Sequence, residues 1–183
     1  KRDIDKSFFY LTNAANRNHV KAQFTLGKIY YDGKFVNKNV NKSIQYLQEA
    51  ANNNHPRALY ILGHFYFKGI NIVQNINKGI SYLYAAANAN DILSQYNLGI
   101  IYLNGINIKR DINKAIYYLS KVAEKNYPIA QYDLGCIYFK DTYQKQNLSK
   151  AIYYFLKSAK NNHAQAQYAL GVIYGTPKYL NYN

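Results

Sequence analysis

The sequence predicts an all-α protein, an α/α superhelical solenoid of antiparallel helix pairs that repeat with a 36-residue period. A Leu-Gly pair recurs five times at this spacing, with its glycines at Gly27, Gly63, Gly99, Gly135 and Gly171. A lysine keeps the same step, at Lys6, Lys42, Lys78, Lys114 and Lys150. Copies that stay in phase along a whole chain indicate identical supersecondary units, each of which buries its apolar face on its neighbours.

The first helix of each pair is predicted from its cap and its apolar face. Phe8, Leu11 and Ala15 lie at i, i+3 and i+7 and therefore share one helical face. Asp3 stands at the N-cap position, and capping residues recur there at Asn39, Asn75, Asp111 and Asn147. Each first helix is expected to end at an asparagine, which tolerates the left-handed backbone conformation: Asn18, Asn54, Asn90, Asn126 and Asn162.

The second helix of each pair follows at once, with Pro56 and Pro128 where a first helical turn accepts proline. The recurring glycines fall in the middle of this helix, where each is less favourable than alanine by roughly 1 kcal/mol. We therefore expect a close helix–helix approach at which a Cβ atom would clash. Gly33, Gly69 and Gly105 are expected to end the helix in the left-handed conformation.

The whole chain, residues 1–183, is expected to be a single solenoid, with no linker interrupting it. Its helix pairs are expected at about residues 3–34, 39–70, 75–106, 111–141 and 147–176. The fourth connection departs from the pattern, with Asp141 in place of the glycine and Gln144 in place of an apolar anchor. Paired the other way, the same helices make four complete repeats between two half-repeats, which predicts weak end-to-end self-association.

The composition limits the function without identifying it. The net charge of +14 comes from 23 Lys and Arg against 9 Asp and Glu, a balance typical of proteins with acidic partners. An AT-rich coding sequence would enrich lysine equally well. No apolar run approaches the ~20 residues of a membrane helix, so no transmembrane segment is expected. The single cysteine, Cys136, favours a cytoplasmic setting and leaves a secretory or ER-luminal one open.

No constellation of catalytic or metal-ligating residues is evident. His19, His55 and His163 occupy one repeat position on three separate units, and they lack the spacing of a zinc ligand set. No glycine-rich phosphate loop is present. The sequence therefore predicts neither an enzyme nor a cofactor.

One copy carries a family motif nearly complete, and it resembles the Sel-1-like repeat, a relative of the tetratricopeptide repeat. The motif residues are Leu98, Gly99, Tyr102, Gly105, Ile108, Asp111, Lys114, Ala115, Tyr118, Ala123 and Asn126. Tyr118 stands where the family commonly has tryptophan, and Asn126 where it commonly has glycine. The resemblance covers residues 3–174. It implies a solenoid whose first motif helices line a concave surface, and a role as an adaptor in protein assemblies.

The candidate binding site is a stripe on the glycine-containing helices. Positions that vary between copies are spaced i, i+4, i+7 and i+11 there, so they share a face that packing does not constrain. The expected groove residues are Lys21, Lys28, Arg57, Ile61, His64, Leu93, Asn97, Ile100, Ile129, Asp133 and Val172. The stripe is basic in its first two copies and apolar beyond. This pattern predicts a peptide with acidic residues at one end and apolar anchors at the other.

Two classes of function fit these observations. The first is a protein–protein interaction adaptor or scaffold that binds a partner peptide or protein in the groove. The alternative is a single-stranded RNA-binding helical-repeat protein, resembling the pentatricopeptide arrays. The charge favours RNA. A code of one base per repeat, however, needs polar side chains at the same groove positions in every copy, and apolar residues replace them midway.

Overall fold

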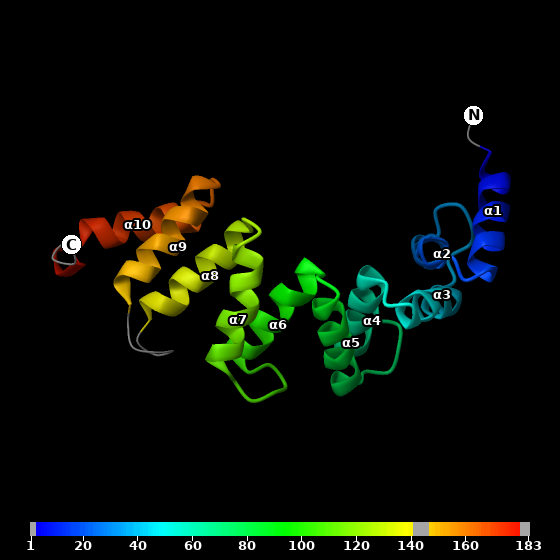
Figure 1. Ribbon diagram of the computed structural model, residues 1–183, viewed down its shortest axis with the longest axis horizontal. Helices are drawn as coiled ribbons and strands as arrows, with labels where there is room; N and C mark the ends of the chain where they lie inside the picture. The colour runs from blue at the N-terminus through cyan, green and yellow to red at the C-terminus, as the bar shows by residue number, and fades with distance from the viewer. Residues whose placement is uncertain (1–2, 141–146, 180–183) are drawn as a thin grey trace. The chain divides into compact units, whose positions relative to one another are not determined.

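The computed structural model describes residues 3–140 and 147–179, and every regular element within them is helical (Figure 1). The first helices of the predicted pairs are α1 (Ile4–Asn16), α3 (Val40–Asn52), α5 (Ile76–Asn88), α7 (Ile112–Ala123) and α9 (Leu148–Lys160). The second helices are α2 (Val20–Asp32), α4 (Pro56–Lys68), α6 (Ile92–Asn104), α8 (Pro128–Phe139) and α10 (Ala164–Gly175). A short 3-10 helix, η1 (Pro177–Tyr179), follows. The all-α repeat solenoid predicted from the sequence is thus confirmed.

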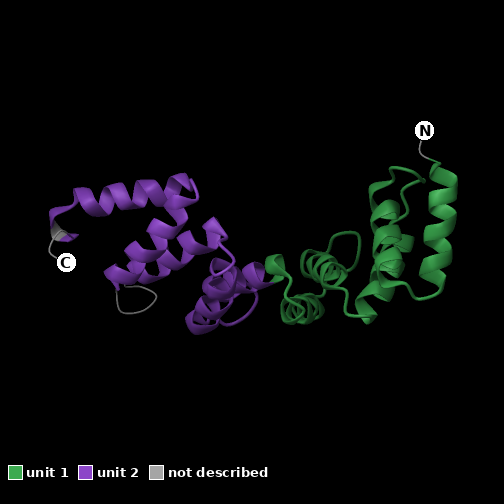
Figure 2. Ribbon diagram, turned by 45° about the horizontal axis from the view of Figure 1, so that its top comes forward, with its two compact units in different colours: residues 1–94 green, residues 95–183 purple. Residues whose placement is uncertain are grey.

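The chain divides into two compact units, residues 1–94 and 95–183 (Figure 2). Within each unit a helix packs mainly on its neighbours in sequence, as expected for a linear array. The second helix of a predicted pair packs more extensively on the next first helix, as α2 does on α3 and α8 on α9, than on its own partner. The more extensive contact is therefore the one between helices joined by the longer connection.

The predicted caps and left-handed residues are confirmed, although the first helices end two or three residues before the predicted asparagines. Each first helix begins with a capping side chain that accepts a hydrogen bond from the backbone N–H of the recurring lysine, as in Asp3 with Lys6 at 3.0 Å. The five predicted asparagines all have a positive φ, between 56° at Asn54 and 62° at Asn90. Gly33, Gly69 and Gly105 also adopt the left-handed conformation. Asp141 and Gln144 lie outside the described residues.

The recurring glycines form the predicted close contacts in four copies of five. A Cβ atom added to Gly27, Gly63 or Gly99 would lie 2.7–3.0 Å from the leucine of the next first helix. At Gly135 the neighbour is the ring of Phe155. The expectation is wrong for Gly171, because no atom lies within 4 Å of its added Cβ. The close approach is made to the following helix, and α10 is followed in the described residues only by η1.

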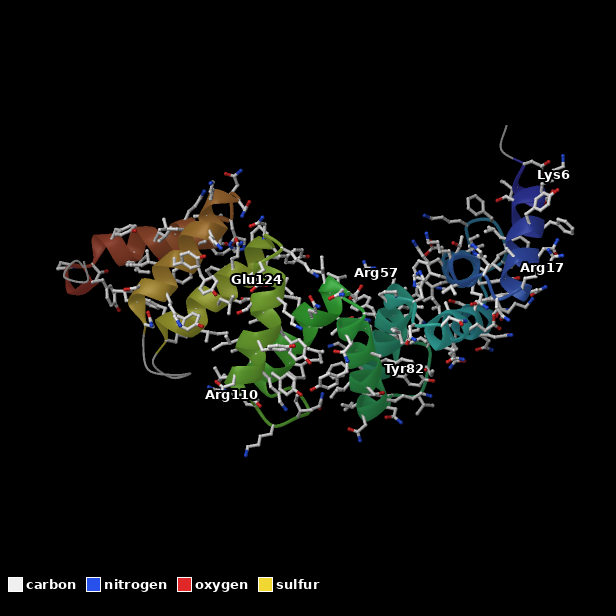
Figure 3. All side chains as sticks on the ribbon, viewed as in Figure 1. Lys6, Arg17, Arg57, Tyr82, Arg110 and Glu124 are labelled. Atoms are coloured by element: carbon white, nitrogen blue, oxygen red, sulfur yellow. The ribbon has the colours of Figure 1, made fainter. Side chains whose placement is uncertain are left out.

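The recurring lysine and tyrosines form a stack that the sequence analysis did not anticipate. Tyr66 and Tyr82 lie parallel with ring centroids 5.7 Å apart, and the Nζ of Lys78 lies 4.2 Å above the Tyr66 centroid. Tyr82 is labelled in Figure 3. Three further stacks repeat the arrangement: Lys42, Tyr30 and Tyr46; Lys114, Tyr102 and Tyr118; Lys150, Tyr138 and Tyr154. A good part of the recurring positive charge thus stabilises the repeats through cation–π contacts.

Buried glutamines hold the two helices of a pair together. Gln131 is fully buried, and its amide donates to the Ala123 carbonyl, 3.0 Å away, at the end of the preceding helix. Gln23 makes the same bond to Ala15 at 3.3 Å. Each of these carbonyl groups, at a helix C-terminus, also accepts from the backbone N–H of the asparagine that ends the helix, Asn126 or Asn18, so the glutamine adds a second hydrogen bond there.

Candidate functional site

Three of the predicted groove residues line one pocket in the first unit. Lys28 of α2, and Ile61 and His64 of α4, meet around a cavity of about 170 Å³. Its remaining lining residues are Gly27, Tyr31, Asp32, Leu47, Tyr60 and Phe65. Lys21 and Arg57, also predicted for this surface, lie exposed and do not line the cavity.

The walls of this pocket are mainly aromatic and aliphatic, and its charged groups stand at one side. Tyr31 and Phe65 pack with ring centroids 5.3 Å apart, and Leu47 is fully buried against Gly27. Lys28 and Asp32 are exposed residues one helical turn apart on α2. The pocket therefore offers an apolar interior beside one cation and one anion.

His64 is not a permanent cation in this pocket. Burial lowers its pKa, and the nearby positive charge of Lys68 lowers it further. The imidazole lies close to parallel with the ring of Tyr60, with centroids 6.3 Å apart. At neutral pH His64 therefore lines the pocket with an uncharged aromatic ring that can also donate or accept one hydrogen bond.

Arg57 is an ion-pair partner within the fold rather than a free groove cation. Its Nη1 atom lies 3.2 Å from Oδ2 of Asp91, whose side chain is nearly buried. The other oxygen of Asp91 accepts from the backbone N–H of Ser94 at 2.8 Å and so caps α6. The guanidinium also lies 5.2 Å from the Tyr60 centroid. The expected basic end of the stripe is therefore supplied by Lys21 and Lys28.

Leu93 lies half-buried at the end of the first unit, and the remaining predicted residues lie on the second helices of the second unit. Ile129 and Val172 are each 44% exposed, whereas Asn97 and Ile100 are half-buried. Asp133 accepts a hydrogen bond from the Tyr96 hydroxyl at 3.0 Å. Burial raises the pKa of Asp133, and the bond from Tyr96 opposes that shift. The second unit thus presents separate apolar side chains and a half-buried carboxyl group.

The histidines that share one repeat position cap helices. The Nδ1 atoms of His19 and His55 accept from the backbone N–H groups of Ala22 and Ala58, at 3.2 and 3.3 Å. His163 occupies the same cap without such a bond and lies against the ring of Tyr132. Across residues 3–140 and 147–179, no three His, Cys, Asp or Glu side chains gather as a metal site would require.

The thiol of Cys136 is poorly suited to nucleophilic chemistry. Burial raises its pKa, which keeps it protonated at neutral pH. A hydrogen bond with Cys136 contributes most to raising the pKa of Tyr132 to about 12. The side chain belongs to the packed cluster of the second unit.

Sequence reasoning missed part of the site. Asp91 and the aromatic residues Tyr31, Tyr60 and Phe65 were not anticipated, although Asp91 shares the repeat position of His19 and His55. That shared position, one residue before each second helix, is the signal that would have identified it as a cap. Within the described residues, no helix has both the length and the apolar content to cross a membrane.

The Sel1 repeat family matches the chain in six consecutive segments, residues 1–19, 20–55, 56–91, 92–127, 128–163 and 164–182. Each inner segment joins a second helix to the following first helix, as α2 joins α3. The family's repeat thus coincides with the more extensive packing. It also agrees with four complete repeats between two partial ones.

Solved structures agree with this assignment, whereas no curated protein matches the chain. A Sel1 repeat protein from Oxalobacter formigenes is 30% identical, with a TM-score of 0.82, over 98% of this chain and 74% of that one. A protective antigen of uropathogenic Escherichia coli with an SLR fold has a TM-score of 0.87 at 24% identity, over 96% of this chain and 38% of its own. The immunity protein Pa5087 from Pseudomonas aeruginosa, at 22% identity, has a TM-score of 0.53 over 86% of this chain and 58% of its own. The chain therefore belongs to the Sel1 repeat family.

Proposed function

We propose that the chain is an adaptor that binds a peptide segment of a partner protein on the exposed face of its second helices. Sel1 repeats generally serve as protein–protein interaction modules. The observation that supports this finer proposal is the pocket between α2 and α4, where Lys28, Ile61 and His64 converge. Its apolar interior suits one apolar side chain of a peptide, as in recognition modes that read a few anchor residues.

The charges around the pocket favour an acidic residue beside that anchor. Lys21 and Lys28 are exposed on α2, one on each side of Thr25. Asp32 lies one turn beyond Lys28 and would repel a carboxylate there. The proposed ligand therefore places its acidic residue toward Lys21, with the apolar anchor between Ile61 and Tyr31.

A peptide selection tests this proposal. A phage-displayed library of short random peptides is selected on the chain, and the recovered peptides are titrated by fluorescence anisotropy. We expect sequences with an apolar residue close to an acidic one. Ile61→Asn places at this position the residue that the next copy has at Asn97. It should weaken binding by roughly tenfold, through faster dissociation and with little salt dependence.

A second variant tests the charge. Lys21→Leu introduces the residue found two copies later at Leu93, and it should slow association mainly at low salt. Phe9→Gln, which uses the residue of the second copy at Gln45, replaces an exposed apolar residue of the first helix α1 and is the matched control outside the proposed binding face. The proposal fails if both α2–α4 variants keep the parent affinity while substitutions on the first helices abolish binding.

A further inference from the structure

The first helices of the second unit carry two exposed tyrosine rings, each packed edge-on against the tyrosine that follows it in the sequence. Tyr117 on α7 is 54% exposed and Tyr153 on α9 is 51% exposed. The Nζ atom of Lys121 lies 4.4 Å from the Tyr117 centroid, and that of Lys157 lies 4.7 Å from the Tyr153 centroid. Each lysine follows its tyrosine by four residues, and the two pairs occupy the same position in successive repeats. We refer to these four residues as the tyrosine–lysine face.

Packing does not require these residue types. The neighbouring residues Tyr118 and Tyr154 supply the rings of the repeat stacks. At the position of Tyr117 the second and third copies have Gln45 and Ser81. At the position of Lys121 they have Glu49 and Ala85, and these copies form the same helices. The tyrosine–lysine face is therefore an addition to the repeat.

The two pairs belong to one continuous surface. The hydroxyl of Ser120 on α7 hydrogen bonds to Tyr154 on α9, so the two helices adjoin there. The negative charge of Glu124, which follows α7 directly, also acts on Lys157 and contributes to raising its pKa. The stacked lysines Lys114 and Lys150 are exposed on the same helices. Apart from Glu124, the anion on α7 is its N-cap Asp111, which is already paired with Lys114 at 3.8 Å. The surface is thus basic with aromatic rings interleaved.

We propose that the tyrosine–lysine face binds single-stranded nucleic acid, with bases stacked on Tyr117 and Tyr153 and backbone phosphates held by Lys121 and Lys157. Stacking on aromatic side chains beside a positively charged track is the usual means of binding single strands without sequence preference. Lys157 also hydrogen bonds to the Tyr153 hydroxyl. Contacts of this kind on an exposed surface are weak, so each lysine can turn to a phosphate when a base takes its place. A duplex hides its base faces, and an acidic peptide would use the lysines and leave the rings unused.

Fluorescence anisotropy with a labelled single-stranded RNA of about 12 nucleotides tests the proposal, since known sites span about 4–16 nucleotides. The double variant Tyr117→Ser and Tyr153→Ser places serine, the residue of the third copy at Ser81, at both positions. It should weaken binding by at least tenfold and leave the salt dependence unchanged.

The double variant Lys121→Ala and Lys157→Ala removes the two charges and uses alanine, the residue of the third copy at Ala85. It should weaken binding and reduce the slope of log K against log salt by about 1.4, since each phosphate contact contributes ~0.7. Circular dichroism should show the parent helix content in both.

The matched control removes the same charge elsewhere. Lys34→Ala with Lys109→Ala changes two exposed lysines outside the tyrosine–lysine face and should leave the affinity within about twofold at moderate salt. An equal loss in this control, equal affinity for an RNA duplex, or no binding of single-stranded RNA by the parent chain would each overturn the proposal. If polyglutamate displaces the RNA and the tyrosine double variant keeps the parent affinity for RNA, the tyrosine–lysine face would be assigned to an acidic protein. That result would also overturn the proposal. The pocket variant Ile61→Asn should bind RNA normally, so this test is independent of peptide binding.

Discussion

A Cβ atom added to Gly135 would lie 2.5 Å from Cδ1 of Phe155, closer than real Cβ atoms approach a neighbour. Gly99 stands in the same relation to Leu119, at 2.7 Å from its Cγ. Gly171, the corresponding residue of the fifth copy, has no atom within 4 Å. Identical residues at one repeat position thus contribute differently to stability, according to whether a following helix covers them.

The variant Gly99→Leu should be destabilised by roughly 1–3 kcal/mol or more, because the added side chain overpacks the contact with Leu119. Urea unfolding followed by circular dichroism measures the change. Gly171→Ala is the control, and it should raise stability by up to ~1 kcal/mol because alanine is the better helix former. A Gly99→Leu chain that unfolds at or above the parent urea midpoint would show that the close approach does not limit the fold.

A substitution guided by the repeat consensus should fail at Gly79. The fourth and fifth copies have Ala115 and Ala151 at this position, so alanine looks like a stabilising replacement. The Cβ of that alanine would, however, lie 2.6 Å from the backbone nitrogen of Phe67, which cannot move aside as a side chain could. We expect Gly79→Ala to lower the free energy of unfolding by ~1–3 kcal/mol. A gain in thermal stability would contradict the observed α4–α5 packing.

The cation–π stacks should be measurable through Lys78. Replacing it by glutamine removes the ammonium above Tyr66 and its 2.9 Å hydrogen bond to the Tyr66 hydroxyl, at an expected loss of about 0.5–1 kcal/mol. That hydrogen bond is the main cause that raises the pKa of Lys78. A raised pKa means that the stabilisation is complete at neutral pH and is lost as the pH rises through the raised value.

Lys6→Gln provides the control for this stack. Lys6 occupies the same repeat position, but its side chain pairs with Asp3 on an exposed surface. Exposed ion pairs of this kind contribute little, so Lys6→Gln should change the unfolding midpoint less than Lys78→Gln does. Equal effects of the two substitutions would show that the contact of Lys78 with Tyr66 adds nothing to stability.

The carboxyl group of Asp133 should make stability depend on pH. Burial raises its pKa, opposed by the bond from Tyr96 and by the charge of His163. The folded chain then holds this proton more tightly than the unfolded chain, so stability decreases as the pH rises from about 4 through the raised pKa. Asp133→Asn, the residue of the previous copy at Asn97, keeps an acceptor for Tyr96 and removes this dependence.

Thermal unfolding over a range of pH measures the effect. The Asp133→Asn chain should melt above the parent at neutral pH, and the difference should shrink below about pH 4, where the aspartate is protonated in both states. A difference that grows toward acid pH would mean that the native state favours the ionised carboxylate.

The sequence by itself determined the local geometry of the repeat. Helix starts at residues such as Asp3 and ends at residues such as Asn18 depend on hydrogen bonds and backbone preferences within a few residues, so they are readable from the residue types. The spacing of Gly27 and its copies likewise identified positions of close approach, because a costly residue retained five times requires a steric reason. The candidate binding stripe was likewise predicted from the positions whose residues differ between copies.

Only the tertiary structure decided which of these residues do more than one task. The sequence pattern predicted Arg57 to be a free cation of the groove. In the fold it pairs with Asp91, 34 residues away, because a carboxylate that is nearly buried requires a partner. The recurring lysine was interpreted only as a source of positive charge, yet Lys78 lies over the ring of Tyr66 on the preceding helix. The pocket at Lys28, Ile61 and His64 likewise depends on how α2 and α4 pack. Contacts such as these join side chains that are far apart in the sequence, so a local residue pattern cannot predict them.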